Sequence, residues 1–157
     1  MNDAEVLQRI ADLGRELPAT PQPVAAYVAV RMAGATAYVA GQVPIVDGVV
    51  VNPGSLGRDV SVDEGRAGAE RAALQALSVL RATLGSFDRL VGILQVTVYV
   101  ASTPDFAEHP QVANVASELF VNVLGETGRH ARAAIGMSSL PLGASVEVAV
   151  TAEIVPA

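Results

Sequence analysis

The sequence predicts one α+β domain, spanning residues 1–157, in which helices pack on one face of a mixed β-sheet. Segments with helical and with strand periodicity alternate, in the order helix, β-hairpin unit, helix, strand, helix, strand, strand. Of the 157 residues 51% are apolar and 17% are charged, which is enough apolar material for a sizeable core. We find no linker or short-period repeat that would divide the chain.

The first element is a helix predicted over residues 3–17, because apolar residues recur there at helical spacing. Pro18, Pro21 and Pro23 follow it. Since proline cannot continue a helix, we expect these residues to form a stiff link to the first strands.

Three β-rich segments come next, at residues 27–32, 36–40 and 49–51. Asp47-Gly48 lies just before the third. Both residues tolerate the positive φ angles of a two-residue turn, so the dipeptide predicts a β-hairpin.

A long helix is predicted to begin after Ser61 and to end at Leu84. Ser61 and Glu64 have the spacing of a capping box, and Gly85 is a plausible stop signal. The strand predicted over residues 90–101 follows this helix. Its apolar face is expected to carry Leu94, Val96, Val98 and Val100.

The last helix is predicted over residues 110–124, and two strands follow near residues 130–137 and 145–155. We expect the two strands to pair as a hairpin about Leu140–Gly143. In that register Arg132 and Glu147 share a face of the sheet, about 13 Å apart between Cα atoms.

One face of the predicted sheet is polar. It carries Gln95, Thr97, Glu147 and Thr151. Polar side chains are costly in an apolar core, so this face must meet water, a ligand or other copies of the chain.

The composition excludes several classes of function. The chain has no cysteine and two histidines, so we expect neither a disulfide nor a metal centre. A net charge of −6 disfavours binding to nucleic acid. No apolar run is long enough for a membrane span, and the acidic N-terminus is unlike a signal peptide, so we expect a cytoplasmic protein. Nucleotide-binding motifs are missing, and no serine stands at a recognised spacing from a histidine, so no cofactor is expected.

Arg132 is the first candidate for chemistry, because it stands among small residues and its planar fork can bind a carboxylate with two hydrogen bonds. The alternative is a surface arginine or a structural ion pair. Glu147 is the second candidate, since a carboxylate on a half-polar strand could orient or deprotonate a water. Its alternative is a salt bridge or a solvated position.

Four further residues have weaker signals. His130 is a possible general base or a polar neighbour of Arg132. Tyr27 could cover a pocket or lie at a subunit contact. Asn114, in the first turn of the last helix, could contact a ligand or be an ordinary polar residue, and Gly41 ends a strand in a plain turn.

These residues together resemble the RidA/YjgF family, also called the L-PSP endoribonuclease-like family, over nearly the whole chain. The longer N-terminal helix and the run from Gly128 to Arg132 are similar to the larger YjgF-like branch. The matching segments are Ala40-Gly41-Gln42-Val43-Pro44, Val98-Tyr99-Val100 with Asp105-Phe106, Asn114 with Glu118 and Phe120, and Arg132 with Leu140-Pro141 and Val146-Glu147-Val148.

The resemblance implies a chorismate mutase-like fold that forms a homotrimer, with the sheets lining a central barrel and the pockets lying between subunits. It implies that Arg132 binds the substrate carboxylate and that Glu147 positions a hydrolytic water. The other pocket residues that it implies are Tyr27, Gly41, Asn114 and backbone groups near Ala134. Many members carry Cys where this chain has Ala134.

The reaction implied by the resemblance is cofactor-free hydrolysis of enamines or imines, such as 2-aminoacrylate and 2-iminopropanoate, to 2-keto acids and ammonia. Such a protein would be a hydrolase like the 2-iminobutanoate/2-iminopropanoate deaminases. Two alternatives stay open. One is a non-catalytic trimer that binds a small carboxylate metabolite. The other is an endoribonuclease, which the acidic composition disfavours.

Overall fold

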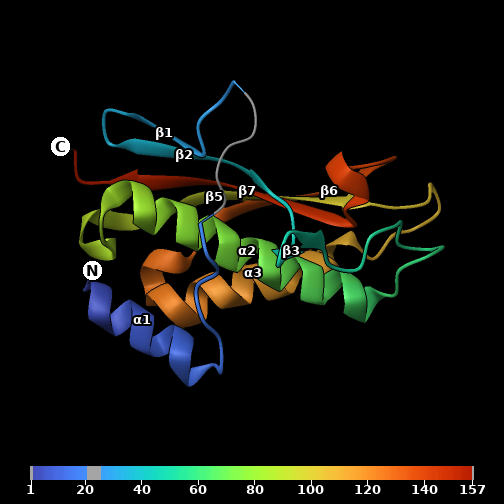
Figure 1. Ribbon diagram of the computed structural model, residues 1–157, viewed down its shortest axis with the longest axis horizontal. Coiled ribbons are helices and arrows are strands. Elements are labelled where there is room, and N and C mark those ends of the chain that lie inside the picture. The colour runs from blue at the N-terminus through green and yellow to red at the C-terminus, as the bar shows by residue number, and fades with distance from the viewer. Residues whose placement is uncertain (1, 21–25, 157) are drawn as a thin grey trace.

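The structure, a computed structural model, describes residues 2–20 and 26–156. Pro21 and Pro23 of the expected stiff link lie outside the described residues. A mixed five-stranded sheet in the order β1-β2-β7-β5-β6 carries helices on one face (Figure 1). This arrangement confirms the α+β class. The strands are β1 (Val30–Ala33), β2 (Thr36–Gln42), β5 (Leu90–Ala101), β6 (Ala131–Met137) and β7 (Val146–Ile154).

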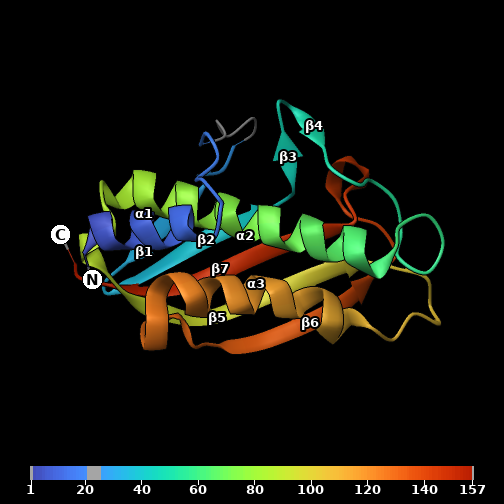
Figure 2. The same cartoon turned by 90° about the horizontal axis from the view of Figure 1, so that it is seen from below.

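Two long helices cover the sheet, α2 (Val62–Leu84) and α3 (His109–Leu124). They lie side by side across the same face (Figure 2). The shorter α1 (Asp3–Asp12) packs on the outer side of this helical layer (Figure 1). The opposite face of the sheet has no helix over it in the described part of the chain.

The core lies between the helices and the sheet. Its β-strand residues alternate with period two, as expected for a sheet buried on one side. Alanines on the inner side of α2 let its backbone approach the strands closely. The fully buried positions include Val96, Val98 and Val100 of β5, Val146, Val148 and Val150 of β7, Ala69, Ala72, Ala73 and Ala76 of α2, and Phe120 of α3.

Helix α2 begins and ends where the sequence predicts. The Ser61 hydroxyl accepts from the backbone N–H of Glu64, whose carboxylate accepts from the Ser61 N–H at 2.8 Å. Gly85 ends the helix at a φ of 85°. Such a cap contributes about 1 kcal/mol to helix stability.

Helix α1 is shorter than predicted, because it ends at Asp12 rather than at residue 17. Gly14 turns the chain at a φ of 69°. Its N–H and that of Arg15 donate to carbonyls of the last helical turn, which satisfies groups that a longer helix would have used. Gly14 therefore stops the helix before the predicted end at residue 17.

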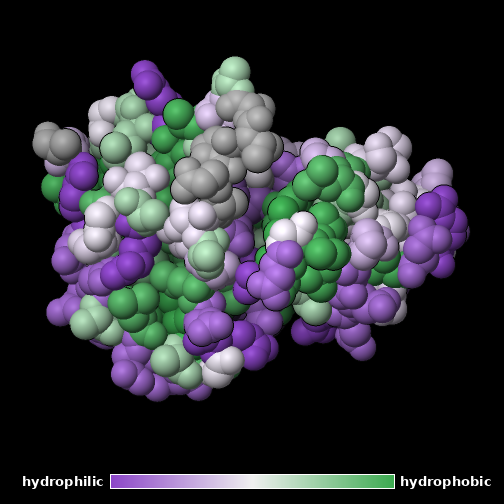
Figure 3. Space-filling view, viewed as in Figure 1, coloured by the Kyte–Doolittle hydropathy of each residue, from purple (hydrophilic) through white to green (hydrophobic). Residues whose placement is uncertain are grey.

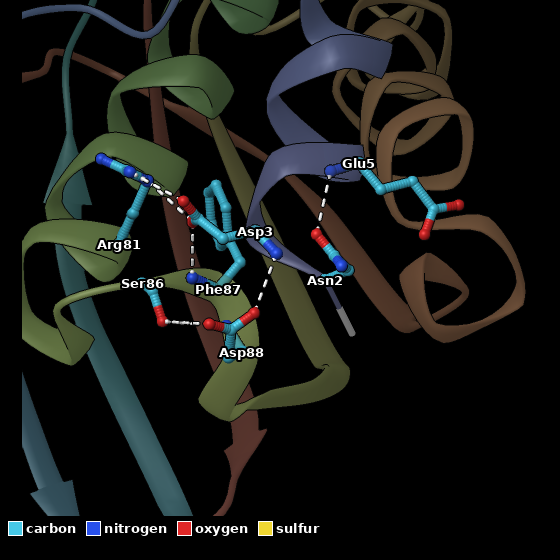
Figure 4. A network of polar contacts seen from close by, with 7 residues as sticks. All are labelled: Asn2, Asp3, Glu5, Arg81, Ser86, Phe87 and Asp88. Carbon is cyan, nitrogen blue, oxygen red and sulfur yellow. Dashed lines mark hydrogen bonds and ion pairs between the residues drawn. The ribbon is translucent and has the colours of Figure 1, made fainter.

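The start of α1 is held on the rest of the molecule by Asp3 (Figure 4). The Asp3 carboxylate accepts two hydrogen bonds from Arg81, at 2.9 and 2.8 Å, and a third from the Phe87 N–H at 2.8 Å. The hydrogen bond from Arg81 is the main cause that lowers the pKa of Asp3. The N–H of Asp3 donates to Asp88. These bonds join α1 to the segment between α2 and β5.

The pairing predicted for the last two strands is wrong. Strand β5 lies between β6 and β7, pairing in parallel with β6 and antiparallel with β7. The turn at Pro141–Gly143 therefore carries the chain past β5 instead of closing a hairpin. Strand β5 is therefore internal to the sheet and pairs along both of its edges, which local sequence patterns do not reveal.

The face predicted for Leu94 is also wrong. Leu94 is 45% exposed, because the ladder between β5 and β7 shifts register between Ile93 and Gln95. Beyond this bulge the alternation follows the prediction. Gln95, Thr97, Glu147 and Thr151 lie on the face without helices, each half-buried or exposed, which confirms the polar face.

The hairpin predicted at Asp47-Gly48 is confirmed. It joins β3 (Ile45–Val46) to β4 (Val49–Val50), with φ angles of 51° at Asp47 and 79° at Gly48. Near it the turn Pro141–Gly143 holds Leu142, which is 72% exposed. Apolar residues gather on this right-hand part of the surface (Figure 3).

In the described part of the chain, no helix combines the length and the apolar character needed to cross a bilayer.

Candidate functional site

Arg132 lies on β6, at the edge of the sheet, with its side chain toward α3. Its Nη1 donates to Asn114 Oδ1 at 2.9 Å and to Ser117 Oγ at 3.2 Å. These two bonds use both hydrogens of Nη1. Nε and Nη2 make no hydrogen bond to a described residue, so the side of the guanidinium that can bind two carboxylate oxygens is free.

Asn114 and Ser117 reach Arg132 together because they are three residues apart on one side of α3. Both are neutral, so they orient the guanidinium without cancelling its charge. The neighbours of Arg132 on β6 are alanines, which leave room beside the fork. The arrangement is that of an oriented cation at a surface edge.

His130 helps to fix the Arg132 guanidinium indirectly, through its contact with Ser117. Its Nδ1 lies 2.7 Å from the Gly128 carbonyl oxygen and its Nε2 lies 3.0 Å from Ser117 Oγ. A carbonyl only accepts, so Nδ1 carries the proton and Nε2 accepts from the Ser117 hydroxyl. Desolvation, followed by the charge of Arg132, lowers the pKa of His130 despite the carbonyl contact, which favours this neutral form.

Glu147 lies against Gly41 on the face of the sheet that has no helices. Any side chain at Gly41 would overlap the Glu147 carboxylate, so this close approach requires glycine. Gly41 stands where β2 breaks its register with β7, between Val39 and Gln42. Partial burial raises the pKa of Glu147, so its carboxyl holds a proton to higher pH than a solvated glutamate does.

Arg132 and Glu147 do not share a face, contrary to the prediction. Arg132 pairs with Val96, whose side chain is buried under the helices, while Glu147 pairs with Tyr99, which faces the other way. Along the strands the two residues are three positions apart, about 10 Å, and they are two strands apart, about 10 Å more. One chain alone does not bring both groups to one small ligand.

Tyr27 and Ala134 complete the predicted set. Tyr27 is 55% exposed in a bend before β1, which begins only at Val30, so it does not open the strand as predicted. It precedes the edge strand opposite β6, so one chain does not bring it near Arg132. Ala134 lies partly buried on the same side of β6 as Arg132, two residues along.

Two serine–histidine contacts were not predicted from the sequence, in which no serine stands at a recognised spacing from a histidine. Ser117 pairs with His130, and Ser102 Oγ lies 3.0 Å from Nε2 of His109. Neither pair has the spacing of a known hydrolase motif. Ser117 lies one helical turn after Asn114, and this spacing could have indicated that Ser117 faces the same strand residue as Asn114. Within the described residues no group of three or more histidine or acidic side chains could hold a metal ion.

A family model described as "YjgF/chorismate_mutase-like, putative endoribonuclease" matches residues 7–154. The chain belongs to this YjgF family. The match includes β6, β7 and α3, which carry Arg132, Glu147 and Asn114.

Relatives of this YjgF chain include protein TCP17 of Trypanosoma cruzi, 42% identical over 144 residues that cover 91% of this chain and 90% of that protein. The structure of Atu1372 from Agrobacterium tumefaciens, a protein of unknown function, superposes with a TM-score of 0.92 at 40% identity, covering 98% of this chain and 94% of that one. A "putative endoribonuclease" of Shewanella oneidensis MR-1 gives a TM-score of 0.91 at 29% identity, covering 95% and 99%.

Proposed function

We propose that this YjgF chain hydrolyses reactive enamines and imines, such as 2-aminoacrylate, to 2-keto acids and ammonia. The observation that supports this most is the free Nε and Nη2 edge of Arg132, with Nη1 fixed by Asn114 and Ser117. An oriented guanidinium can bind the carboxylate of a small imino acid with two hydrogen bonds. The imine carbon is already electrophilic, so holding it beside a water provides most of the rate enhancement.

Glu147 is the proposed partner of the water. Ionised, its carboxylate accepts a proton from the water as the water attacks the imine carbon. The attack turns the nitrogen of the protonated imine into an amine. That nitrogen takes the proton from Glu147 and leaves as ammonia when the C–N bond breaks, while the added hydroxyl releases its proton to solvent and becomes the keto oxygen. The raised pKa of Glu147 fits a group that takes up a proton and gives it back during the reaction.

The site is proposed to form between two copies of the chain in a homotrimer. Arg132 lies at a sheet edge and Glu147 on the uncovered face, so an edge laid across the face of a neighbour would bring the two together. The half-polar open face supports such an assembly, because it has no packing partner within the described chain. The proposed location of this enzyme is the cytoplasm.

The test couples a dehydratase that releases 2-aminoacrylate to measurement of the 2-keto acid. Wild-type protein should speed keto-acid release, and Arg132→Ala should lower kcat/KM about 10- to 100-fold, the loss expected for hydrogen bonds to a charged group. Arg129→Ala is the matched control, since Arg129 is exposed and pairs only with Glu126 among the described residues. Equal rates for wild type and Arg132→Ala would refute the proposal.

A non-catalytic role in binding a small carboxylate is the second candidate, favoured by the distance between Arg132 and Glu147 within one chain. It predicts that 2-keto acids bind to wild type but not to Arg132→Ala, with no acceleration of imine hydrolysis. Calorimetry with pyruvate, run beside the coupled assay, separates the two candidates.

A further inference from the structure

A cavity of about 410 Å³ with polar and apolar walls lies where β5 and β6 end and α3 begins. Its walls include the hydrogen-bond donors Ser102, Thr103, His109 and Arg58. No carboxylate of the described residues lines it, although Asp59 binds Arg58 from outside the wall. Asp59 thus partly neutralises the one guanidinium in the wall, and the Asp105 carboxylate holds the Thr103 side chain, which leaves the pair of Ser102 and His109 as the donor nearest to β6.

In the cavity wall, contacts with Ser102 and Phe106 hold the imidazole of His109 in place. The imidazole bonds to the Ser102 hydroxyl at 3.0 Å, and the ring of Phe106 meets it edge-on with centroids 5.0 Å apart. A Cβ at Gly136 would lie 2.5 Å from His109 Nε2 and 3.1 Å from Ser102 Oγ. Only glycine on β6 lets the imidazole lie this close to the strand.

The cavity lies on the same side of β6 as Arg132. Arg132 bonds to Asn114 and Ser117 of α3, and Gly136 lies against His109 of the same helix. The four steps from residue 132 to residue 136 span about 13 Å along a strand. The eight steps from residue 117 back to residue 109 span about 12 Å along a helix. Strand and helix thus run antiparallel, with Arg132 at one end and the cavity at the other.

Between the two ends β6 presents only Ala134, whose side chain is a single methyl group. The strand residues on this side therefore shrink from arginine to alanine to glycine. Among the residues of β6 on this side, no large side chain therefore stands between Arg132 and the pair of Ser102 and His109.

We propose that the cavity receives the end of the substrate side chain, so that the site prefers 2-imino acids whose side chain ends in a hydrogen-bond acceptor, a carboxylate or a carboxamide. This inference rests on the proposed function, which places the first carboxylate at Arg132. The hydrogen-bonded pair of Ser102 and His109 would provide the donor for the distal oxygen, because the Thr103 side chain already bonds the Asp105 carboxylate. The partial neutralisation of Arg58 lets an amide bind as well as a second carboxylate.

NMR of the two histidines of the chain can test this proposal, because one lies near the proposed site for the carboxylate and the other near the proposed site for the side chain. His130 contacts Ser117, which holds Arg132, and His109 lines the cavity. Imidazole resonances are assigned with the variant His109→Gln. The probes are three 2-keto acids, 2-oxobutanoate, 2-oxoglutarate and 2-oxoglutaramate, which are the products of the corresponding imines.

All three keto acids should shift the resonances of His130. Only 2-oxoglutarate and 2-oxoglutaramate should also shift His109, and they should bind about tenfold more tightly than 2-oxobutanoate. The affinities of 2-oxoglutarate and 2-oxoglutaramate, compared with each other, show whether the cavity prefers a side chain that ends in a carboxylate or in a carboxamide. Ser102→Ala should reduce the preference for the long ligands about tenfold. Ser86→Ala, the same change before the other end of β5, should keep it.

Two failures are distinguishable. If His130 responds and His109 does not, or if all three ligands bind equally, the side-chain site is overturned and the proposed function stands. If His130 responds to no ligand, the carboxylate is not bound at Arg132, and both the proposed function and the inference built on it are overturned.

Discussion

Arg132 and Glu147 point to opposite faces of one sheet, with strand β5 between their strands. Each group suits half of the proposed hydrolytic site, because one presents a free guanidinium edge and the other a half-buried carboxyl group. The geometry of a single chain separates the two groups by more than the length of a small imino acid. The proposed homotrimer would bring the two groups together from neighbouring chains.

Mixing two variants of low activity tests the shared site directly. Arg132→Ala retains Glu147, and Glu147→Gln retains Arg132, so a mixed assembly holds some interfaces with both groups intact. For random mixing in equal amounts, about one quarter of the interfaces should regain activity. The assay is imine hydrolysis after the two variants are refolded together. Activity that stays absent in the mixture would place both groups in one chain.

Ser117→Ala should weaken the hold on Arg132 without removing its charge. Ser117 is the hydroxyl that accepts from Arg132 and donates to His130. We expect KM for the imine to rise about tenfold, as for a lost hydrogen bond to a charged group, while kcat changes less. Ser117→Thr keeps the hydroxyl and should restore much of the loss. Equal values for alanine and wild type would mean that Asn114 alone orients the guanidinium.

Gly41→Ala should abolish activity and leave the fold intact. The added methyl group occupies the place of the Glu147 carboxylate, which lies at the end of a flexible side chain and can rotate away. Gly68→Ala is the control, because its nearest heavy atoms outside α2 are 3.6 Å away and alanine favours a helix by about 1 kcal/mol. Thermal unfolding should show Gly68→Ala at least as stable as wild type. Full activity of Gly41→Ala would mean that the position of the Glu147 carboxylate does not matter for the reaction.

Glu147 should make stability depend on pH. Burial raises its pKa in the folded chain above the ordinary value of 4.5, so the folded state binds the proton more tightly than the unfolded state. Its contribution to the free energy of unfolding is therefore complete below pH 4.5 and is lost as the pH rises through the raised pKa. Glu147→Gln should remove this part of the pH dependence in urea titrations. An unchanged profile would contradict the burial of the carboxyl group.

Asp3→Asn should loosen α1. The carboxylate accepts two bonds from Arg81 and one from the Phe87 N–H, so its loss should cost about 1–3 kcal/mol and lower Tm by several degrees. Because Arg81 lowers the pKa of Asp3, this stabilisation is present above pH 3.8 and is lost as the pH falls through the lowered pKa. Asp12→Asn, at the other end of α1, is the control.

Local signals predicted most of the elements well. The capping box at Ser61 and the turn at Asp47-Gly48 depend on neighbouring residues only, and both are as expected. The position of β5 between β6 and β7 depends on pairing between distant segments, which no local pattern encodes. The same limit hid the opposite orientation of Arg132 and Glu147. Neighbours of Arg132 such as Ser117 were missed because they come from a helix that packs on the strand.

The neutral partners of Arg132 have a consequence for how a ligand arrives. Asn114 and Ser117 leave the guanidinium with its full positive charge, yet it belongs to a chain of net charge −6. An approaching anion therefore feels repulsion at long range and attraction only near the fork. At 0.1 M salt the screening length is about 10 Å, so salt weakens the long-range repulsion more than it weakens the close attraction between the anion and the guanidinium. Moderate ionic strength should thus quicken the capture of anionic metabolites, the reverse of electrostatic steering.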